Sequence, residues 1–157
     1  MKLRNTQLDF GYLQKRYDTD AIVIHHSDGG NDVDFSAEDI HRMHQNLGWA
    51  GAGYHFIIRK DGTVEDARPE WAVGAHVEGH NYYTLGICFS GDFEFAYPSP
   101  AQVAACVELI RDLSRDYDIP IDRDHILGHR ELCDTDCPGQ NLYSWLDTIV
   151  RQAANDS

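Results

Sequence analysis

The chain has 157 residues, the size of one typical domain, which leaves no room for a second binding module. It carries 13 basic and 26 acidic residues, a formal net charge of −13, and this excess disfavours nucleic acid and anionic membranes as partners. No apolar run approaches the roughly 18–20 residues that span a bilayer, and residues 1–20 lack the apolar stretch of a secretory leader. We therefore expect a monomer that is made without a signal peptide and does not insert into membranes.

The first predicted elements are an N-terminal arm and a buried strand. Residues 1–20 are mixed in character and are predicted to lie as an arm on the domain formed by residues 21–157. The arm offers three apolar anchors, which are Leu8, Phe10 and Leu13. Residues 21–26 (AIVIHH) are apolar and β-branched until they end in two histidines, which predicts a buried strand with polar side chains at its end.

A helix and a hairpin are predicted next. Ser36 followed by Asp39 is a typical helix start, and the apolar residues that follow recur at helical spacing. His41 and His44 are expected on the surface or edge of this helix. Residues 54–66 contain two short apolar stretches around the turn RKDG, which predicts two strands of a hairpin.

The second half of the chain alternates strands and helices. Residues 85–89 (LGICF) predict a central strand, and Ser99 with Pro100 predicts the start of a long amphipathic helix. Residues 125–128 (HILG) predict another strand and, after a loop, residues 142–150 predict a closing helix. This order predicts a single α/β domain in which helices pack on both faces of a mixed central β-sheet.

Histidine and cysteine side chains gather at the predicted strand ends. His129 and Cys137 lie eight positions apart (137 − 129) in a loop, which can aim an imidazole and a thiolate at one point. Adjacent strand residues point to opposite faces, so either His25 or His26 can join them, but not both. Such a set suits zinc and leaves a fourth position for water, as in catalytic sites. Other triples remain open on spacing alone, because the chain has nine histidines and four cysteines.

Several motifs in a fixed order give the sequence a family resemblance. They are IVIHHS, GYHFIIRKDGTVEDAR, AVGAH, TLGICFSGDF, PSPAQ, GHRELCDTDCPG and LYSW, and they run from Ala21 to Trp145. The sequence resembles the type 2 N-acetylmuramoyl-L-alanine amidases, the zinc family that includes phage T7 lysozyme and the peptidoglycan recognition proteins. The resemblance implies a zinc hydrolase that cuts the amide bond between N-acetylmuramic acid and L-alanine in peptidoglycan.

The resemblance also implies roles for individual residues. His25, His129 and Cys137 match the zinc ligands of the family, with one Zn²⁺ per chain. Tyr54 matches a tyrosine that stands beside the metal and assists catalysis. Thr135 stands where phage T7 lysozyme has a lysine and where recognition proteins with amidase activity have threonine, so a hydroxyl is the expected second donor.

Two departures separate this chain from the branch of the family that recycles muropeptides. That branch has an aspartate at the position of Cys137 and a glutamate at the position of Cys88. Both differences point away from recycling. The resemblance then implies a phage or prophage endolysin, or a bacterial autolysin, that acts on the cell wall after release through a partner pore.

The remaining histidine, cysteine and tryptophan residues receive simpler interpretations. His76 matches a position that lines the substrate groove of the family, and Trp49 can stack on a sugar or stem peptide, although packing explains it equally well. All four cysteines are expected to be free thiols. The expected packed or loop residues are His26 (packed), Cys133 (a loop thiol), and Trp71 and Trp145 (core).

Two other functions remain open at this point. The first is a recognition module that binds muropeptides without cutting them, but the presence of His25, Tyr54, His129 and Cys137 together argues against it. The second is a regulatory protein that binds a polymerase, which nothing in the sequence excludes.

Overall fold

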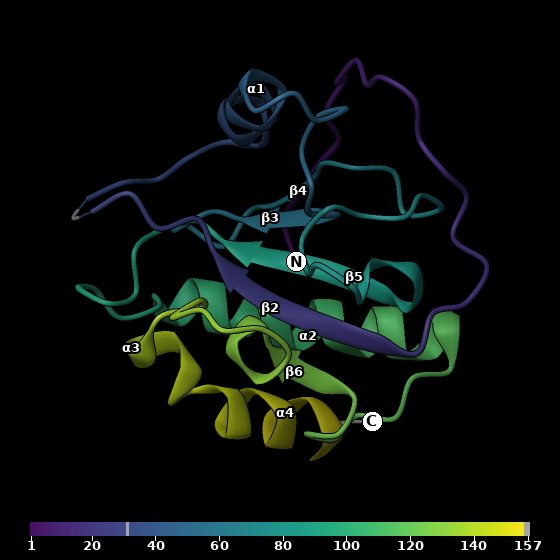
Figure 1. Cartoon of the computed structure of the whole chain (residues 1–157). Coiled ribbons are helices and arrows are strands. Elements are labelled where there is room, and N and C mark those ends of the chain that lie inside the picture. Colours follow the sequence, from purple (N-terminus) through teal and green to yellow (C-terminus); the bar gives the residue numbers. More distant parts are fainter. Residues whose placement is uncertain (31, 156–157) are drawn as a thin grey trace.

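A mixed six-stranded β-sheet forms the centre of the computed structural model, which describes residues 1–30 and 32–155 (Figure 1). The strands are β1 (Leu3–Arg4), β2 (Ala21–His26), β3 (Phe56–Ile58), β4 (Val64–Asp66), β5 (Thr84–Phe89) and β6 (Ile126–Gly128). Their order across the sheet is β1-β4-β3-β5-β2-β6. The hairpin strands β3 and β4 pair antiparallel, and the other neighbours pair parallel.

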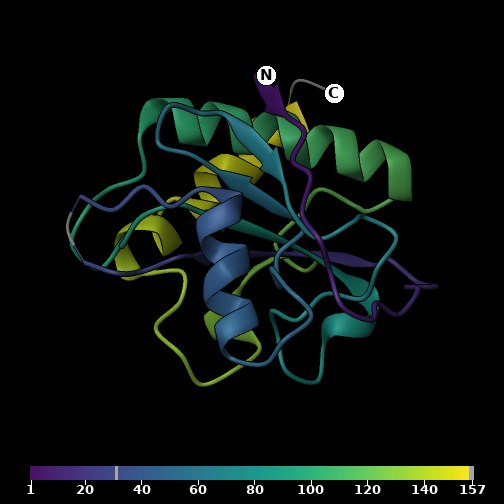
Figure 2. The same ribbon diagram turned by 90° about the horizontal axis from the view of Figure 1, so that it is seen from above.

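Helices cover both faces of this sheet. On one face lies α1 (Ala37–Asn46), which Figure 2 shows crossing above the strands. On the opposite face α2 (Pro100–Tyr117) packs beside α4 (Leu146–Asn155), and the short α3 (Gln140–Tyr143) precedes α4. The predicted α/β fold, with a mixed sheet between helices, is therefore confirmed.

Two hydrophobic clusters fill the space between the sheet and the helices. The larger cluster lies between the sheet and the α2–α4 pair and includes Ile22 and Ile24 of β2. The smaller cluster lies under α1 and includes Cys88 of β5. Because side chains alternate along a strand, β2 directs His26 to the face of the larger cluster and His25 to the face under α1.

The helix starts follow the capping signals in the sequence. The Ser36 hydroxyl accepts a hydrogen bond from the backbone N–H of Asp39, and the Asp39 carboxylate accepts one from the N–H of Ser36. Ser99 and Gln102 form the same reciprocal pair at the start of α2. These bonds satisfy N–H groups that have no partner within a helix, which explains why both helices begin where the sequence predicts.

The N-terminal arm contributes more than the sequence predicts. Leu3 and Arg4 form β1, an edge strand that pairs with β4, and the short length of this pairing explains why no periodic pattern reveals it. Leu8 and Phe10 pack against the smaller cluster, as expected of anchors. The first residues thereby attach to the sheet edge and to the layer under α1.

The closing helix and two tryptophans differ from prediction. The predicted single helix is divided into α3 and α4, because the Ser144 hydroxyl donates to the carbonyl of Asn141 and the N–H of Trp145 donates to Leu142, three residues back. Trp71 and Trp145 are 52% and 38% exposed, so their predicted core positions are wrong.

All four cysteines are free thiols, as predicted. Cys88 and Cys106 are buried, whereas Cys133 and Cys137 are half-buried in the loop that follows β6. Among the described residues, no helix is long and apolar enough to cross a membrane.

Candidate active site

Two neighbouring parallel strands bring His25 and His129 together. His25 lies at the end of β2, and His129 follows β6 directly as the first residue of the 3₁₀ turn η2 (His129–Glu131). The register pairs Ile24 of β2 with Gly128 of β6. The next residue in each segment is a histidine, His25 and His129 respectively. Their ring centroids lie 4.6 Å apart. Ligand sites commonly form at the carboxyl ends of parallel strands, and this pair occupies such a position.

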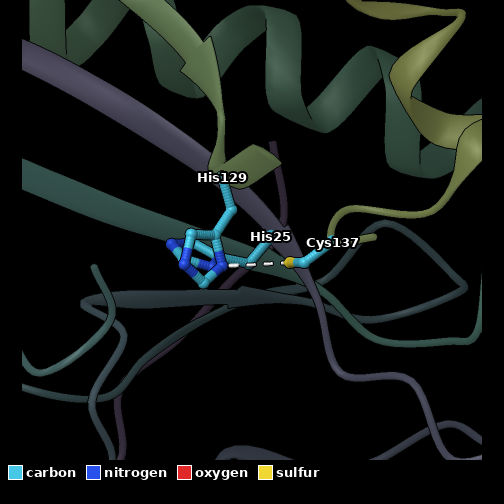
Figure 3. A group of neighbouring side chains, drawn as sticks. All are labelled: His25, His129 and Cys137. Carbon is cyan, nitrogen blue, oxygen red and sulfur yellow. Dashed lines mark hydrogen bonds between the residues drawn. The ribbon is translucent and has the colours of Figure 1, made fainter. Parts of the chain in front are cut away.

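The loop after η2 returns Cys137 to the same point. The N–H of Arg130 donates to the carbonyl of Cys137 at 2.9 Å, which closes the loop. Cys137 Sγ lies 3.6 Å from Nδ1 of His25 and accepts a hydrogen bond from the N–H of His26 at 3.4 Å. Figure 3 shows the three side chains converging, and their ligand atoms lie within 4.8 Å of one another.

The donor atoms of this group fit a soft divalent metal ion. Among the described residues, Nδ1 of His129 is buried without a hydrogen-bond partner, which is the state of a nitrogen whose partner is a metal. Burial lowers the pKa of His25 well below its usual range, and burial also lowers the pKa of His129, so both rings favour the neutral form that binds metals. Burial raises the pKa of the Cys137 thiol to about 12, so a bound metal has to displace the thiol proton.

Tyr54 lies beside this group. Its ring centroid is 4.9 Å from that of His25 and 5.5 Å from that of His44. The backbone before it is fixed because Gly53 donates to Nδ1 of His44 at 2.8 Å and passes so close to Ala75 that a Cβ on Gly53 would lie 2.1 Å from the Ala75 carbonyl oxygen. Burial raises the pKa of Tyr54 well above its usual value, so its hydroxyl stays protonated and can donate.

A cleft of about 570 Å³ opens above these side chains. It is lined by residues from α1, the loop before β3, the loop before β5 and the loop after β6: His44, Trp49, Tyr54, Ala75, His76, Val77, Glu78, Asn81, His129, Cys133, Asp134 and Thr135. The four predicted site residues Tyr54, Thr135, His76 and Trp49 all line this cleft. Trp49 is 43% exposed and lines the cleft, and its ring packs at a tilt against the ring of His44, with the ring centroids 4.6 Å apart.

His76 has a second contact that the sequence did not predict. It lines the cleft, yet it is buried, and its Nδ1 lies 2.8 Å from Nε2 of His25. Thr135 is half-buried, and its hydroxyl accepts a hydrogen bond from the N–H of Cys137 at 3.3 Å. Both residues therefore touch the group formed by His25, His129 and Cys137 as well as the cleft.

Other histidines near the group have structural contacts. His26 is packed as predicted, and its Nδ1 accepts a hydrogen bond from the N–H of Phe93. His55 is fully buried between the N–H of Gly86, which donates to its Nδ1, and the carbonyl of Ala72.

Two further residues of the segment between His129 and Cys137 are Glu131 and Cys133. Glu131 forms an ion pair with Arg123 and accepts a hydrogen bond from the N–H of Gly128 at 2.9 Å, so its carboxylate is occupied outside the cleft. Cys133 is the expected free loop thiol and lies at the cleft rim.

His44 and His41 lie in other surroundings than the sequence predicts. His44 was expected at the helix surface, but it lines the cleft, and burial lowers its pKa to about 4. His41 is buried and bonds to the N–H of Ala52 and the carbonyl of Asp9. A usable signal existed: His44 follows Ile40 by four positions, so both side chains share the helix face that packs toward the sheet.

Known proteins match this chain over most of its length. The family model for N-acetylmuramoyl-L-alanine amidases matches residues 15–140. The endolysin of Escherichia phage T7 is 34% identical over 138 residues, covering 85% of this chain and 89% of the relative. Peptidoglycan-recognition protein SC2 of Drosophila melanogaster is 35% identical over 134 residues, covering 80% and 71%.

Solved structures show the same relationship. The N-acetylmuramoyl-L-alanine amidase LysC from Clostridium intestinale URNW has a TM-score of 0.86 and 32% identity, and the match covers 96% of this chain and 98% of that one. The chain therefore belongs to the N-acetylmuramoyl-L-alanine amidase family. It is an amide hydrolase with the activity that gives this family its name.

Proposed function

We propose that this chain is a zinc-dependent enzyme that degrades peptidoglycan by cutting the amide between the lactyl group of N-acetylmuramic acid and L-alanine. The observation that carries the proposal is the convergence of His25, His129 and Cys137 beside the cleft. Two neutral imidazoles and one thiolate are a ligand set that zinc prefers, and three protein ligands are the number found in catalytic zinc sites.

The protein side chains supply positioning and proton donors. A bound zinc ion supplies Lewis-acid polarisation of the amide carbonyl and a water whose pKa is lowered to about 7. The hydroxyl of Tyr54 stays protonated, and the Tyr54 ring lies beside the ring of His25, so we assign this hydroxyl to donate to the oxygen that gains negative charge. Thr135 lines the cleft, and its hydroxyl accepts a hydrogen bond from the N–H of Cys137. We assign this hydroxyl as the second donor.

The cleft is suited to a muramyl peptide rather than to a polymer with phosphates. His76 and Trp49 both line its wall, the former buried and polar and the latter exposed and aromatic. An aromatic face binds the apolar side of a sugar or stem peptide, and the acidic chain repels polyanions. We assign both residues to substrate binding.

The biological role follows from the relatives. Several of them are phage endolysins, and this chain spans most of their length. We infer that it acts as a monomer on the bacterial cell wall after release from the cell, as a phage endolysin or a bacterial autolysin.

The competing function is a recognition module that binds muropeptides without cutting them. Incubation of the purified protein with sacculi, followed by mass spectrometry of the soluble products, separates the two. The proposal predicts peptides with free N-terminal L-alanine and glycan strands without new reducing ends. Binding to sacculi without release of amino termini would support the recognition module, and new reducing ends would indicate a glycosidase.

A further inference from the structure

A chain of hydrogen bonds runs from the metal-binding group into the protein. The Thr84 hydroxyl donates its single hydrogen to the carbonyl of His80 at 2.7 Å. Its oxygen can then only accept from Nε2 of His76, which lies 3.2 Å away. His76 Nδ1 lies 2.8 Å from Nε2 of His25. The hydrogen bonds thus run in one direction, from His25 through His76 and Thr84 to the carbonyl of His80.

This direction fixes where the protons lie on both rings. A neutral imidazole carries one N–H, so if Nε2 of His76 donates to Thr84, Nδ1 of His76 must accept. Nε2 of His25 is then the donor, and Nδ1 of His25 keeps its lone pair. That lone pair is on the side of Cys137, whose Sγ is 3.6 Å away.

The fold makes room for this arrangement. A Cβ on Gly74 would lie 2.6 Å from Cδ2 of His76, and a Cβ on Gly86 would lie 2.8 Å from Cγ and Nδ1 of the same ring. The His76 backbone is held as well, because its N–H donates to the Asn81 side chain at 2.9 Å. Thr84 is fully buried on β5, so water does not compete for its hydroxyl.

We propose that Thr84 and His76 are positioning residues that fix the tautomer of His25, so that Nδ1 of His25 is always the nitrogen offered to the metal. The inference rests on the proposed metal site and assigns the second role of His76, beside its place in the cleft wall. Partners that orient a ligating histidine typically change metal affinity by about 10–100-fold.

Replacing Thr84 tests this series of hydrogen bonds and leaves the cleft lining unchanged, since Thr84 is not among the lining residues. The variant Thr84→Val keeps the shape of the side chain but removes the oxygen that accepts from His76. The hydrogen on Nε2 of His76 then keeps only the weaker interaction with the Thr84 backbone. The tautomer with hydrogen on Nδ1 of His76 becomes more populated, and it donates to His25 and leaves the lone pair of His25 on the wrong nitrogen. We expect zinc affinity, measured by competition with a chromophoric chelator, to fall about 10-fold or more, and Thr84→Ser to restore it.

Thr6→Val is the matched control. The Thr6 hydroxyl also donates to a backbone carbonyl at 2.7 Å, that of Asp66, but Thr6 belongs to the N-terminal arm. A general loss of stability would weaken both Val variants, whereas the inference predicts wild-type zinc affinity for Thr6→Val.

Nitrogen-15 spectra of the histidine rings in metal-free wild-type protein give a readout that needs neither zinc nor a variant. The inference predicts that His25 and His76 both carry hydrogen on Nε2. Hydrogen on Nδ1 of His25, or equal zinc affinity in wild type and a folded Thr84→Val, would overturn the inference and leave the proposed function standing. A wild-type protein that binds no zinc would overturn the proposed function and this inference together.

Discussion

Cys137 Sγ lies 3.6 Å from Nδ1 of His25, although 112 positions separate the two residues in the chain. The contact depends on the parallel pairing of β2 with β6, which aligns His25 with the start of the loop that carries Cys137. The proposed metal site is therefore a property of the folded sheet and its loop, and each proposed ligand can be tested separately.

The first prediction separates the ligating thiol from its neighbour. Cys137→Ser replaces a soft thiolate with a weak neutral oxygen, so bound zinc and amide hydrolysis should be lost together. Cys133→Ser should retain its zinc, because Cys133 is not one of the three converging ligands. Metal analysis of both purified variants measures this, and equal zinc loss in the two would contradict the assignment.

The second prediction concerns the Tyr54 hydroxyl. Tyr54→Phe should lower turnover by roughly 10²–10³, the usual effect of losing one donor to a transition state, while zinc content stays unchanged. Tyr12→Phe removes a hydroxyl from an exposed ring and serves as the control. Turnover of Tyr54→Phe at the wild-type rate on the same sacculi would reduce Tyr54 to a packing role.

The third prediction concerns acid stability. Burial lowers the pKa of His55 to about 3, whereas an unperturbed histidine titrates near 6.5. Below pH 6.5 the unfolded chain binds a proton that the folded chain excludes, so folding stability is lost as the pH falls from 6.5 toward 3. At pH 5 this histidine alone should lower the free energy of unfolding by about 2 kcal/mol.

Urea titrations of the metal-free protein between neutral pH and pH 5 measure this loss. The variant His55→Gln cannot take up a proton there, so its stability should depend less steeply on pH even where its absolute stability is lower. The same slope in both proteins would show that His55 is not the group that titrates.

The fourth prediction concerns a charge cluster that joins the arm to the sheet. Glu65 is 2% exposed and accepts hydrogen bonds from Arg4, Arg59 and the N–H of Ala37, at 2.8 to 3.0 Å. Glu65→Gln leaves two arginines without their shared carboxylate. Because both arginines reach water, we expect a loss of about 2–3 kcal/mol in unfolding free energy.

Glu38 provides the comparison for this cluster. It pairs with Arg4 on the exposed side, so Glu38→Gln should cost less than about 1 kcal/mol. Thermal or denaturant unfolding of the two variants gives both values, and equal losses would contradict the role of the buried carboxylate.

The strands and candidate metal-binding residues that the sequence predicts have a clear local pattern of apolar and polar residues. The run from Ala21 to His26 is apolar until its last two residues, and this pattern alone places histidines at a strand end. Alternation then allows either His25 or His26 to bind a metal, and only the motif resemblance selects His25. In the structure His25 lies beside His129 and Cys137, whereas Nδ1 of His26 accepts a hydrogen bond from the N–H of Phe93 in the larger cluster.

Other features depend on contacts between distant segments, which a local pattern does not contain. The His25–His76 hydrogen bond joins residues 51 positions apart and needs the ring of His76 to fit over Gly86. The edge strand β1 has two residues, too few for a periodic signal. The position of His44, in contrast, follows from the helical pattern, since its helix buries Ile40 four positions earlier.

We propose that His25, His129 and Cys137 hold one zinc ion on which amide hydrolysis depends. The most direct test measures zinc per chain and the release of L-alanine amino termini in one preparation: as purified, after exhaustive chelation, and after zinc is restored. We expect one zinc per chain, loss of both signals on chelation and recovery of both when zinc is restored. Full hydrolysis by protein from which all metal has been removed would contradict it.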